Sequence, residues 1–147
     1  MPRLPAIATF DTPIEVPFYD LDPMNVVWHG RYPQYLEIAR CNLLDHVGFN
    51  YARMREIGYV FPIVDMRIQY VASAHFAERL IVRAEIVEFE HRLKIRYVIR
   101  NAQTSKRVTK AYTSQVAVRL SDGVMLLACP DELIEHMRKW SQTTSTV

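Results

Sequence analysis

The spacing of hydrophobic positions along this chain is helical in its first part and alternating afterwards. From Tyr35 to Val47, apolar residues recur at helical spacing and form a broad stripe, which predicts one long helix covered on most sides. Pro33 fits the first turn of that helix, where a missing N–H costs nothing, so the helix is expected to start between His29 and Tyr32. Gly48 is the expected end.

The remaining pattern is mostly that of β-strands. A proline-rich extended arm precedes a first strand, and a short second helix is expected between Asn50 as its cap and Gly58 as its end. The predicted strands are 14–19, 61–71, 80–89, 93–100 and 108–120, with a short strand at 124–128 pairing back across a turn at 121–123. Asp131 is expected to cap a final helix, 132–140. The simplest way to bury these elements is an α+β fold in which one curved antiparallel sheet wraps around the long helix.

Composition narrows the class of protein. The 147 residues predict a single domain, 1–147, with an N-terminal arm at 1–12 and a frayed tail at 141–147. Half the residues are hydrophobic and the formal charge is +2, which favours a globular protein and gives no reason to expect a nucleic-acid partner. No run is long and apolar enough for a membrane helix or a signal peptide, and the two cysteines are expected to be reduced. We therefore expect a cytoplasmic protein without a membrane partner.

The candidate chemistry lies just before the long helix. Asp20 and Asp22 end the first extended run, and Trp28 and His29 follow in the loop. A carboxylate beside a helix N-terminus, where N–H groups are unbonded and carry partial positive charge, can act as nucleophile or general base. Each residue alone has an ordinary structural explanation, because Asp is common in turns and aromatic residues are common in cores. The chain contains no Gly-x-Ser-x-Gly motif, no phosphate-binding glycine loop and no metal-ligand spacing.

Taken together, the run from Asp22 to Tyr32 and the helix after it resemble the 4-hydroxybenzoyl-CoA thioesterase family of hotdog-fold acyl-CoA thioesterases. Segments 61–64 and 70–82 also resemble the second-strand region of that family, and the likeness extends from Pro13 to Met137. The resemblance implies a hotdog fold, with an antiparallel curved sheet of five or six strands around one central helix. It also implies that subunits join their sheets into a homodimer with two interfacial sites, and that dimers can pair into a homotetramer.

The resemblance also implies roles for particular residues. Asp22 would attack the thioester carbonyl or activate water, while a backbone N–H near His29 holds the carbonyl oxygen. The His29 side chain would line the site or orient Asp22. Residues expected to bind substrate are Trp28, Tyr32, Val64, Ser73, His91, Arg92 and Lys94, of which the last three would bind the phosphates of coenzyme A. No metal or cofactor is expected, since coenzyme A enters only as part of the substrate.

Several points stay open on sequence alone. The chain departs from the family pattern at Met24-Asn25, at Arg31, at Ser73 and at Ala77-Glu78, where relatives often carry Gly-Asp, so the acyl pocket and its entrance can differ. The acyl group, fatty or aromatic, and the choice between dimer and tetramer are not determined. Alternative functions are a non-catalytic protein that binds acyl thioesters, as a sensor or carrier-protein partner, and an enoyl-thioester hydratase or dehydratase on the same fold.

Overall fold

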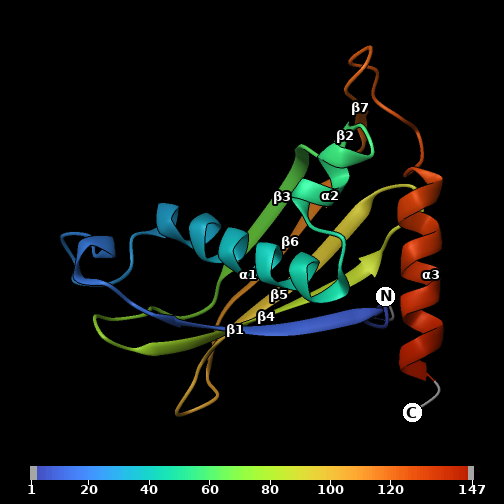
Figure 1. The fold of residues 1–147 in the computed structure, drawn as a ribbon. Helices are drawn as coiled ribbons and strands as arrows, with labels where there is room; N and C mark the ends of the chain where they lie inside the picture. The colour runs from blue at the N-terminus through green and yellow to red at the C-terminus, as the bar shows by residue number, and fades with distance from the viewer. Residues whose placement is uncertain (1–2, 146–147) are drawn as a thin grey trace.

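The computed structural model describes residues 3–145, in which a five-stranded antiparallel sheet packs against one long helix (Figure 1). In spatial order the strands are β1 (Ala8–Glu15), β4 (Arg79–Glu88), β5 (Leu93–Asn101), β6 (Arg107–Gln115) and β3 (Ile63–Tyr70). A separate two-stranded ribbon pairs β2 (Tyr59–Val60) with β7 (Val118–Arg119). The predicted α+β architecture, a curved antiparallel sheet around a central helix, is confirmed.

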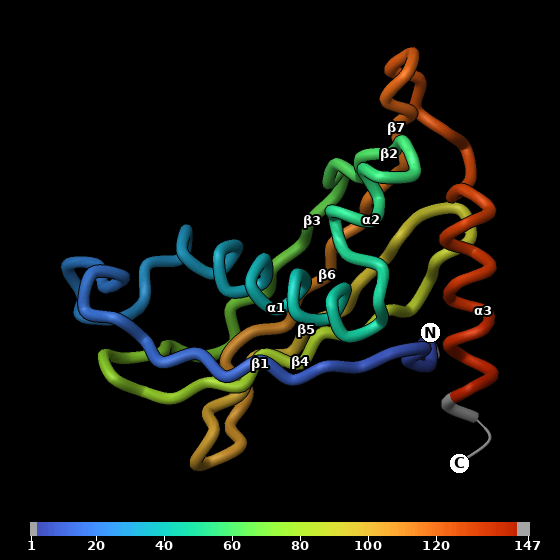
Figure 2. The backbone as a smooth tube through the Cα atoms, in the orientation of Figure 1, coloured from blue at the N-terminus to red at the C-terminus, as the bar shows by residue number. Residues whose placement is uncertain are grey.

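The long helix α1 (Tyr32–Val47) begins and ends where the sequence predicts. A single 3₁₀ turn, His29–Arg31, leads into it, and Gly48 ends it in the left-handed conformation with φ of 79°. α1 lies across one face of the sheet (Figure 2), and its apolar stripe forms the core together with inward-facing residues of β4 and β5. Leu36, Ala39 and Leu43 are fully buried, so the apolar stripe of the helix is covered as the sequence predicts.

The first strand lies earlier in the chain than predicted. β1 covers Ala8–Glu15 and pairs with β4, whereas Phe18–Asp20 is a 3₁₀ turn and not part of a strand. The apolar pattern was misleading there, because Phe18 is 72% exposed while the polar Thr12 is buried. The expected arm at 1–12 is therefore strand from Ala8 onward.

The C-terminal elements also differ from the predicted ones. The long strand expected at 108–120 is divided into β6 and β7, and segment 124–128 contributes only a single bridge between Val118 and Met125. Helix α3 (Asp131–Ser145) is longer than 132–140 and includes most of the predicted frayed tail, whose last two residues lie outside the described residues. α3 stands at one end of the sheet, beside the β4–β5 hairpin (Figure 1).

The predicted short helix is present as α2 (Tyr51–Glu56), and the Asn50 side chain caps it by accepting from the Arg53 N–H. Within residues 3–145, no helix combines the length and apolar character needed to cross a bilayer.

Strand β3 forms one edge of the sheet. Its alternation is as predicted, but most of its side chains are exposed on both faces, including Val64 at 56% and Met66 at 44%. β3 therefore offers a free edge with exposed apolar side chains, which is the kind of edge that pairs with another strand.

Candidate active site

The loop before α1 is held by a buried carboxylate. Asp20 is 4% exposed, and its Oδ2 accepts a hydrogen bond of 2.7 Å from the Tyr35 hydroxyl on α1. Its Oδ1 lies 3.5 Å from Arg31 Nε, and its backbone carbonyl accepts from the Trp28 N–H. Burial, and then the bond to Asp20, raises the pKa of the Tyr35 hydroxyl. Asp20 thus ties the loop to the helix and has a structural role.

Asp22 lies in a tight turn that leaves part of its carboxylate unbonded. Asp22 Oδ1 accepts from the Met24 N–H at 2.8 Å and from the Val26 N–H at 3.5 Å, and Asn25 supports the turn in the left-handed conformation with φ of 62°. Among the residues described, none forms a hydrogen bond or ion pair with Asp22 Oδ2. One oxygen is therefore held in place while the other is free for chemistry.

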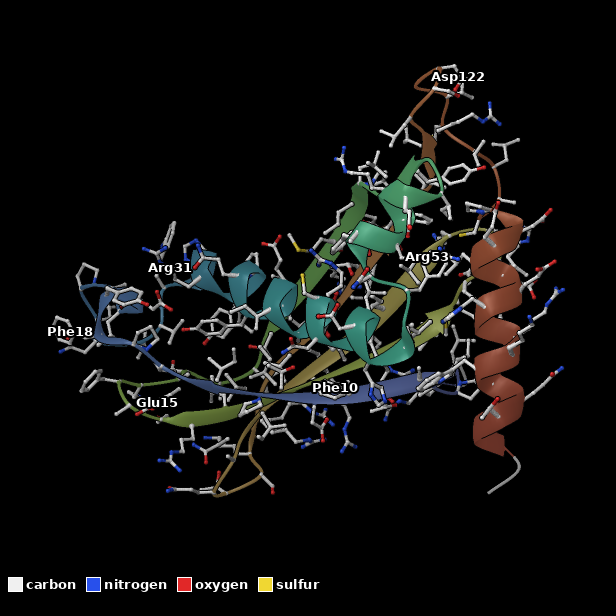
Figure 3. The ribbon with its side chains drawn as sticks, viewed as in Figure 1. Phe10, Glu15, Phe18, Arg31, Arg53 and Asp122 are labelled. Atoms are coloured by element: carbon white, nitrogen blue, oxygen red, sulfur yellow. The ribbon has the colours of Figure 1, made fainter. Side chains whose placement is uncertain are left out.

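A pocket of about 270 Å³ brings together Asp22 and the start of the helix. The lining residues are Asp22, Met24, Val26, Val27, His29, Tyr32, Tyr70, Val71, Ala72 and Ser73. Four residues predicted for the site, Asp22, His29, Tyr32 and Ser73, thus surround one cavity. Figure 3 shows where this part of the molecule lies: the labelled Phe18 and Arg31 are at one end of the molecule, far from Asp122.

The backbone at the helix start is available to hold an oxygen atom. Within residues 3–145, the N–H groups of His29 and Gly30 donate no hydrogen bond, whereas the Arg31 N–H bonds to the Trp28 carbonyl. Such groups at a helix N-terminus carry partial positive charge and favour negative charge beside them. The geometry of this end of the pocket therefore suits a developing oxyanion.

Tyr70 is a pocket residue that the sequence did not reveal. Its hydroxyl donates a hydrogen bond of 2.9 Å to the carbonyl of His29, and its ring lies against Tyr32, with 5.4 Å between ring centroids. Burial raises the pKa of Tyr32, which packs under the helix start. Tyr70 therefore connects the end of β3 to the first turn before α1. The sequence placed Tyr70 on the apolar face of its strand and in the family-like segment 70–82, but gave it no role at the site.

Trp28 adjoins the pocket without lining it, and Val64 lies at the opposite end of β3 from the pocket residue Tyr70. The indole of Trp28 lies so close to Gly30 that a Cβ on Gly30 would be 2.6 Å from the ring. The Arg31 guanidinium carbon is 5.8 Å from the centroid of the same ring. Trp28 thus covers the helix start from outside, which only a glycine at position 30 allows. Val64 projects from the free edge strand, where it is largely exposed.

The entrance loop follows β3 and departs from the family pattern. The Ala74 carbonyl accepts from the Val27 N–H at 2.9 Å, which connects this loop to the one carrying Asp22. Ala77 has a φ of 64°, a conformation that favours glycine, which is the residue that the sequence resemblance led us to expect there. The departure at Ala77 therefore introduces local strain, while Ser73 remains at the pocket.

The three residues predicted to bind phosphate lie elsewhere in the same chain. His91 and Arg92 belong to the β4–β5 hairpin beside α3, where Arg92 pairs with Glu88 at 3.2 Å. Lys94 lies on the sheet face turned away from α1, with its Nζ 4.6 Å from the centroid of the Tyr112 ring. None of the three lines the Asp22 pocket of its own chain. In the described part of the chain, no three His, Cys, Asp or Glu side chains gather as metal ligands.

The fold and the site together define a hotdog-type protein with a carboxylate beside the start of its central helix. Comparison with known families matches residues 16–140 to the thioesterase-like superfamily, and the chain belongs to that family. The family expected from the sequence is thereby confirmed.

Individual relatives agree with this assignment. The chain is 33% identical over 76 residues to YneP of Bacillus subtilis, named as an acyl-CoA thioesterase, and spans about half of each protein, 52% of this chain and 55% of YneP. It is 25% identical over 124 residues to the acyl-CoA thioester hydrolase YbgC of Escherichia coli, covering 84% of both chains. The structure of a DHNA-CoA thioesterase from Staphylococcus aureus superposes with a TM-score of 0.80 at 22% identity, covering 94% of this chain and 91% of that one. This last likeness confirms the hotdog fold.

Proposed function

We propose that this protein hydrolyses acyl-CoA thioesters to a free acid and coenzyme A, with Asp22 as its catalytic carboxylate. The observation that carries the proposal is that Asp22 lines one pocket with His29, whose backbone N–H donates no hydrogen bond within residues 3–145. The names of YneP and YbgC support the substrate class.

In this mechanism the two oxygens of Asp22 have different tasks. Oδ1, fixed by two backbone N–H groups, orients the carboxylate, and Oδ2 reacts. Oδ2 either attacks the thioester carbon, expelling the thiolate of coenzyme A and leaving an anhydride that water hydrolyses, or takes a proton from the attacking water. Both routes place negative charge on the carbonyl oxygen. The N–H groups of His29 and Gly30 stabilise that charge, and one such donor contributes about 3 kcal/mol to the transition state.

The pocket is completed, in this proposal, by a second copy of the chain paired along β3. The free edge of β3 and its exposed apolar residues support a homodimer with a continuous sheet, and two dimers can form a homotetramer. The Tyr70 end of β3 adjoins the Asp22 pocket. At the other end of β3, Ile63 pairs with Gln115 of β6, which pairs in turn with Leu93 at the start of β5. Antiparallel pairing brings the partner's opposite strand end beside the Tyr70 end.

This pairing gives Val64, His91 and Arg92 a place in the site. Val64 and the hairpin with His91 and Arg92 lie toward the Ile63 end of the sheet, so they would approach the pocket of the other subunit. Trp28 would border the acyl group at the outer side of the helix start. The acyl group itself, fatty or aromatic, is left to experiment.

The decisive experiment compares Asp22→Asn with the wild type on a panel of aliphatic and aromatic acyl-CoA esters, following released thiol with a colorimetric reagent. We expect kcat to fall by about a thousandfold or more, because the amide can neither attack nor accept the proton. Asp122→Asn, in a distant exposed turn, is the matched control and should retain activity (Figure 3). Circular dichroism and thermal unfolding check that both variants are folded.

Other results would give the site a different function. Undiminished hydrolysis by Asp22→Asn would refute the assigned role of that residue. If wild-type protein binds acyl-CoA in calorimetry but releases no thiol from any ester, the protein is a binding module. Loss of the conjugated absorbance of enoyl-CoA without thiol release would identify a hydratase.

A further inference from the structure

A second cavity, of about 490 Å³, lies on the sheet face turned away from α1. It extends over β5, β6 and β3, with Arg3 and Leu4 at its border, and shares no lining residue with the Asp22 pocket. Its volume falls within the range of about 300–1,000 Å³ that is usual for small-molecule sites. Because the sheet separates the two cavities, the chemistry of the Asp22 pocket does not explain the residues that line the second cavity.

The lining of this cavity is strongly cationic. Seven of the 18 basic side chains of the chain line it, whereas none of its lining residues is acidic. Arg3 and Arg96 share one carboxylate, Glu85, each at 3.1 Å. Within residues 3–145, no carboxylate lies within ion-pair distance of the other five, which are Arg67, Lys94, Arg100, Arg107 and Lys110. The whole chain has a formal charge of only +2, so the positive charge is concentrated at this face.

Strand register creates this concentration. Arg100 on β5 is directly opposite Arg107 on β6, although like charges at opposed positions destabilise a sheet. Arg67 and Arg96 flank Tyr112 from its two sides in one row across β3, β6 and β5. The buried Nε of Arg107 has no hydrogen-bond partner in the described chain. Arg67, Arg100 and Arg107 thus lie beside other cations, whereas Arg96 and Lys94 are opposite Glu85 and Glu88 on β4.

A different part of the same face shows the usual arrangement of surface charge. On β1 and β4, Arg83 forms two hydrogen bonds with Asp11, at 2.9 and 3.0 Å. Five of the seven cavity cations have no such pair within residues 3–145, so an ordinary solvated surface does not account for them. Association with the same face of a second copy would place like charges together and is unfavourable.

We propose that this cavity binds a polyphosphate group, meaning two or more linked phosphates carried by a small molecule. Guanidinium groups bind phosphate oxygens through paired hydrogen bonds, and a concave surface of one charge sign raises the local concentration of anions. A single phosphate group is too small to contact all of these adjacent cations at once. The phosphates can come from a free nucleotide or polyphosphate, or from the nucleotide end of an acyl-CoA.

The test is calorimetric titration of the full-length protein with inorganic tripolyphosphate, which requires no turnover and is independent of the proposed hydrolysis. The wild type should bind at one site per chain. The double variant R67Q/K110Q, which changes two cavity cations without breaking an ion pair, should bind about tenfold more weakly or worse. The control R55Q/K139Q removes the same charge from exposed helical positions outside the cavity and should bind like the wild type.

Two results overturn the proposal. One is an equal loss of affinity in both double variants, which indicates non-specific attraction. The other is binding of tripolyphosphate no tighter than that of sulfate at matched ionic strength.

A kinetic arm distinguishes the sources of the phosphate groups. If tripolyphosphate competes with acyl-CoA and R67Q/K110Q raises KM at unchanged kcat, the site holds the nucleotide end of the substrate. If affinity for tripolyphosphate is lost while KM is unchanged, the ligand is a free polyphosphate. Both outcomes support a polyphosphate site. Should the protein hydrolyse no ester, competition between tripolyphosphate and coenzyme A in calorimetry replaces this arm.

Discussion

Replacing Tyr35 with phenylalanine removes only the hydroxyl that bonds to the buried carboxylate of Asp20. The ring can stay in place, so packing is preserved and the hydrogen bond alone is tested. A hydrogen bond to a charged acceptor contributes about 1.5–3 kcal/mol. In the variant, the Asp20 carboxylate is left with Arg31 at 3.5 Å as its side-chain partner, and the Asp20 side chain is only 5% exposed to water. We therefore expect Y35F to lower the free energy of unfolding by about 2 kcal/mol.

Urea and thermal unfolding measure this loss. With an m-value of about 2 kcal/mol per molar urea, the transition midpoint should fall by about 1 M. The melting temperature should fall by about 4–8 °C for a chain of this size. Tyr19→Phe is the control, because Tyr19 lies in the same loop with its side chain 78% exposed, and it should change stability by under about 0.5 kcal/mol.

The pH dependence provides an independent check. The pKa of Tyr35 is raised in the folded chain by burial and then by the Asp20 bond, while in the unfolded chain it is about 10. Above pH 10 the unfolded chain therefore binds fewer protons than the folded one, and stability falls as the pH rises. One such group contributes a slope of about 1.4 kcal/mol per pH unit. The stability gap between wild type and Y35F should be full at pH 8 and shrink above pH 10.

Two results would refute this reasoning. A loss no larger than that of Y19F at pH 8 would mean that the Tyr35–Asp20 bond does not stabilise the loop. A gap that stays constant up to pH 11 would mean that Tyr35 ionises alike in the folded and unfolded chains.

Two further predictions concern the free edge and the cysteines. Met66→Lys places a charge on the exposed edge strand. Light scattering should therefore show a shift from the proposed dimer to monomer, and hydrolysis should fall in parallel. An unchanged assembly would contradict pairing along β3. Burial raises the pKa of Cys129 to about 12. At pH 8 a thiol reagent should therefore modify the half-buried Cys41 first, and Cys129 only after denaturation. Peptide mass spectrometry of the modified protein measures this order. Early modification of Cys129 in folded protein would contradict its burial.

Local stereochemistry explains which elements the sequence predicted. Pro33 and Gly48 restrict the backbone themselves, so both ends of α1 were predictable from single residues. Asp22 was proposed as the catalytic residue because it belongs to a contiguous motif, and the structure places it at a pocket. β1 was placed too late because its residues Thr9, Asp11 and Thr12 are polar, and its pairing with β4 joins segments about 70 residues apart.

Long-range contacts account for what the sequence did not reveal. Tyr70 reaches the His29 carbonyl across 41 residues of chain, and nothing local marks that contact. Of the basic residues of β5, only Lys94 was expected to bind phosphate. Their concentration with Arg67 and Arg107 depends on the register of three strands, which a single sequence does not determine.

Strand β3 contributes to both cavities through adjacent residues. Tyr70 lines the Asp22 pocket, while Gln69 and Arg67 line the cationic cavity on the opposite face. Substitutions can therefore alter one cavity without touching the other. Insertion or deletion of one residue, in contrast, would slip the strand and exchange the two linings at once. As this family diverges, the length of β3 should vary far less than its composition.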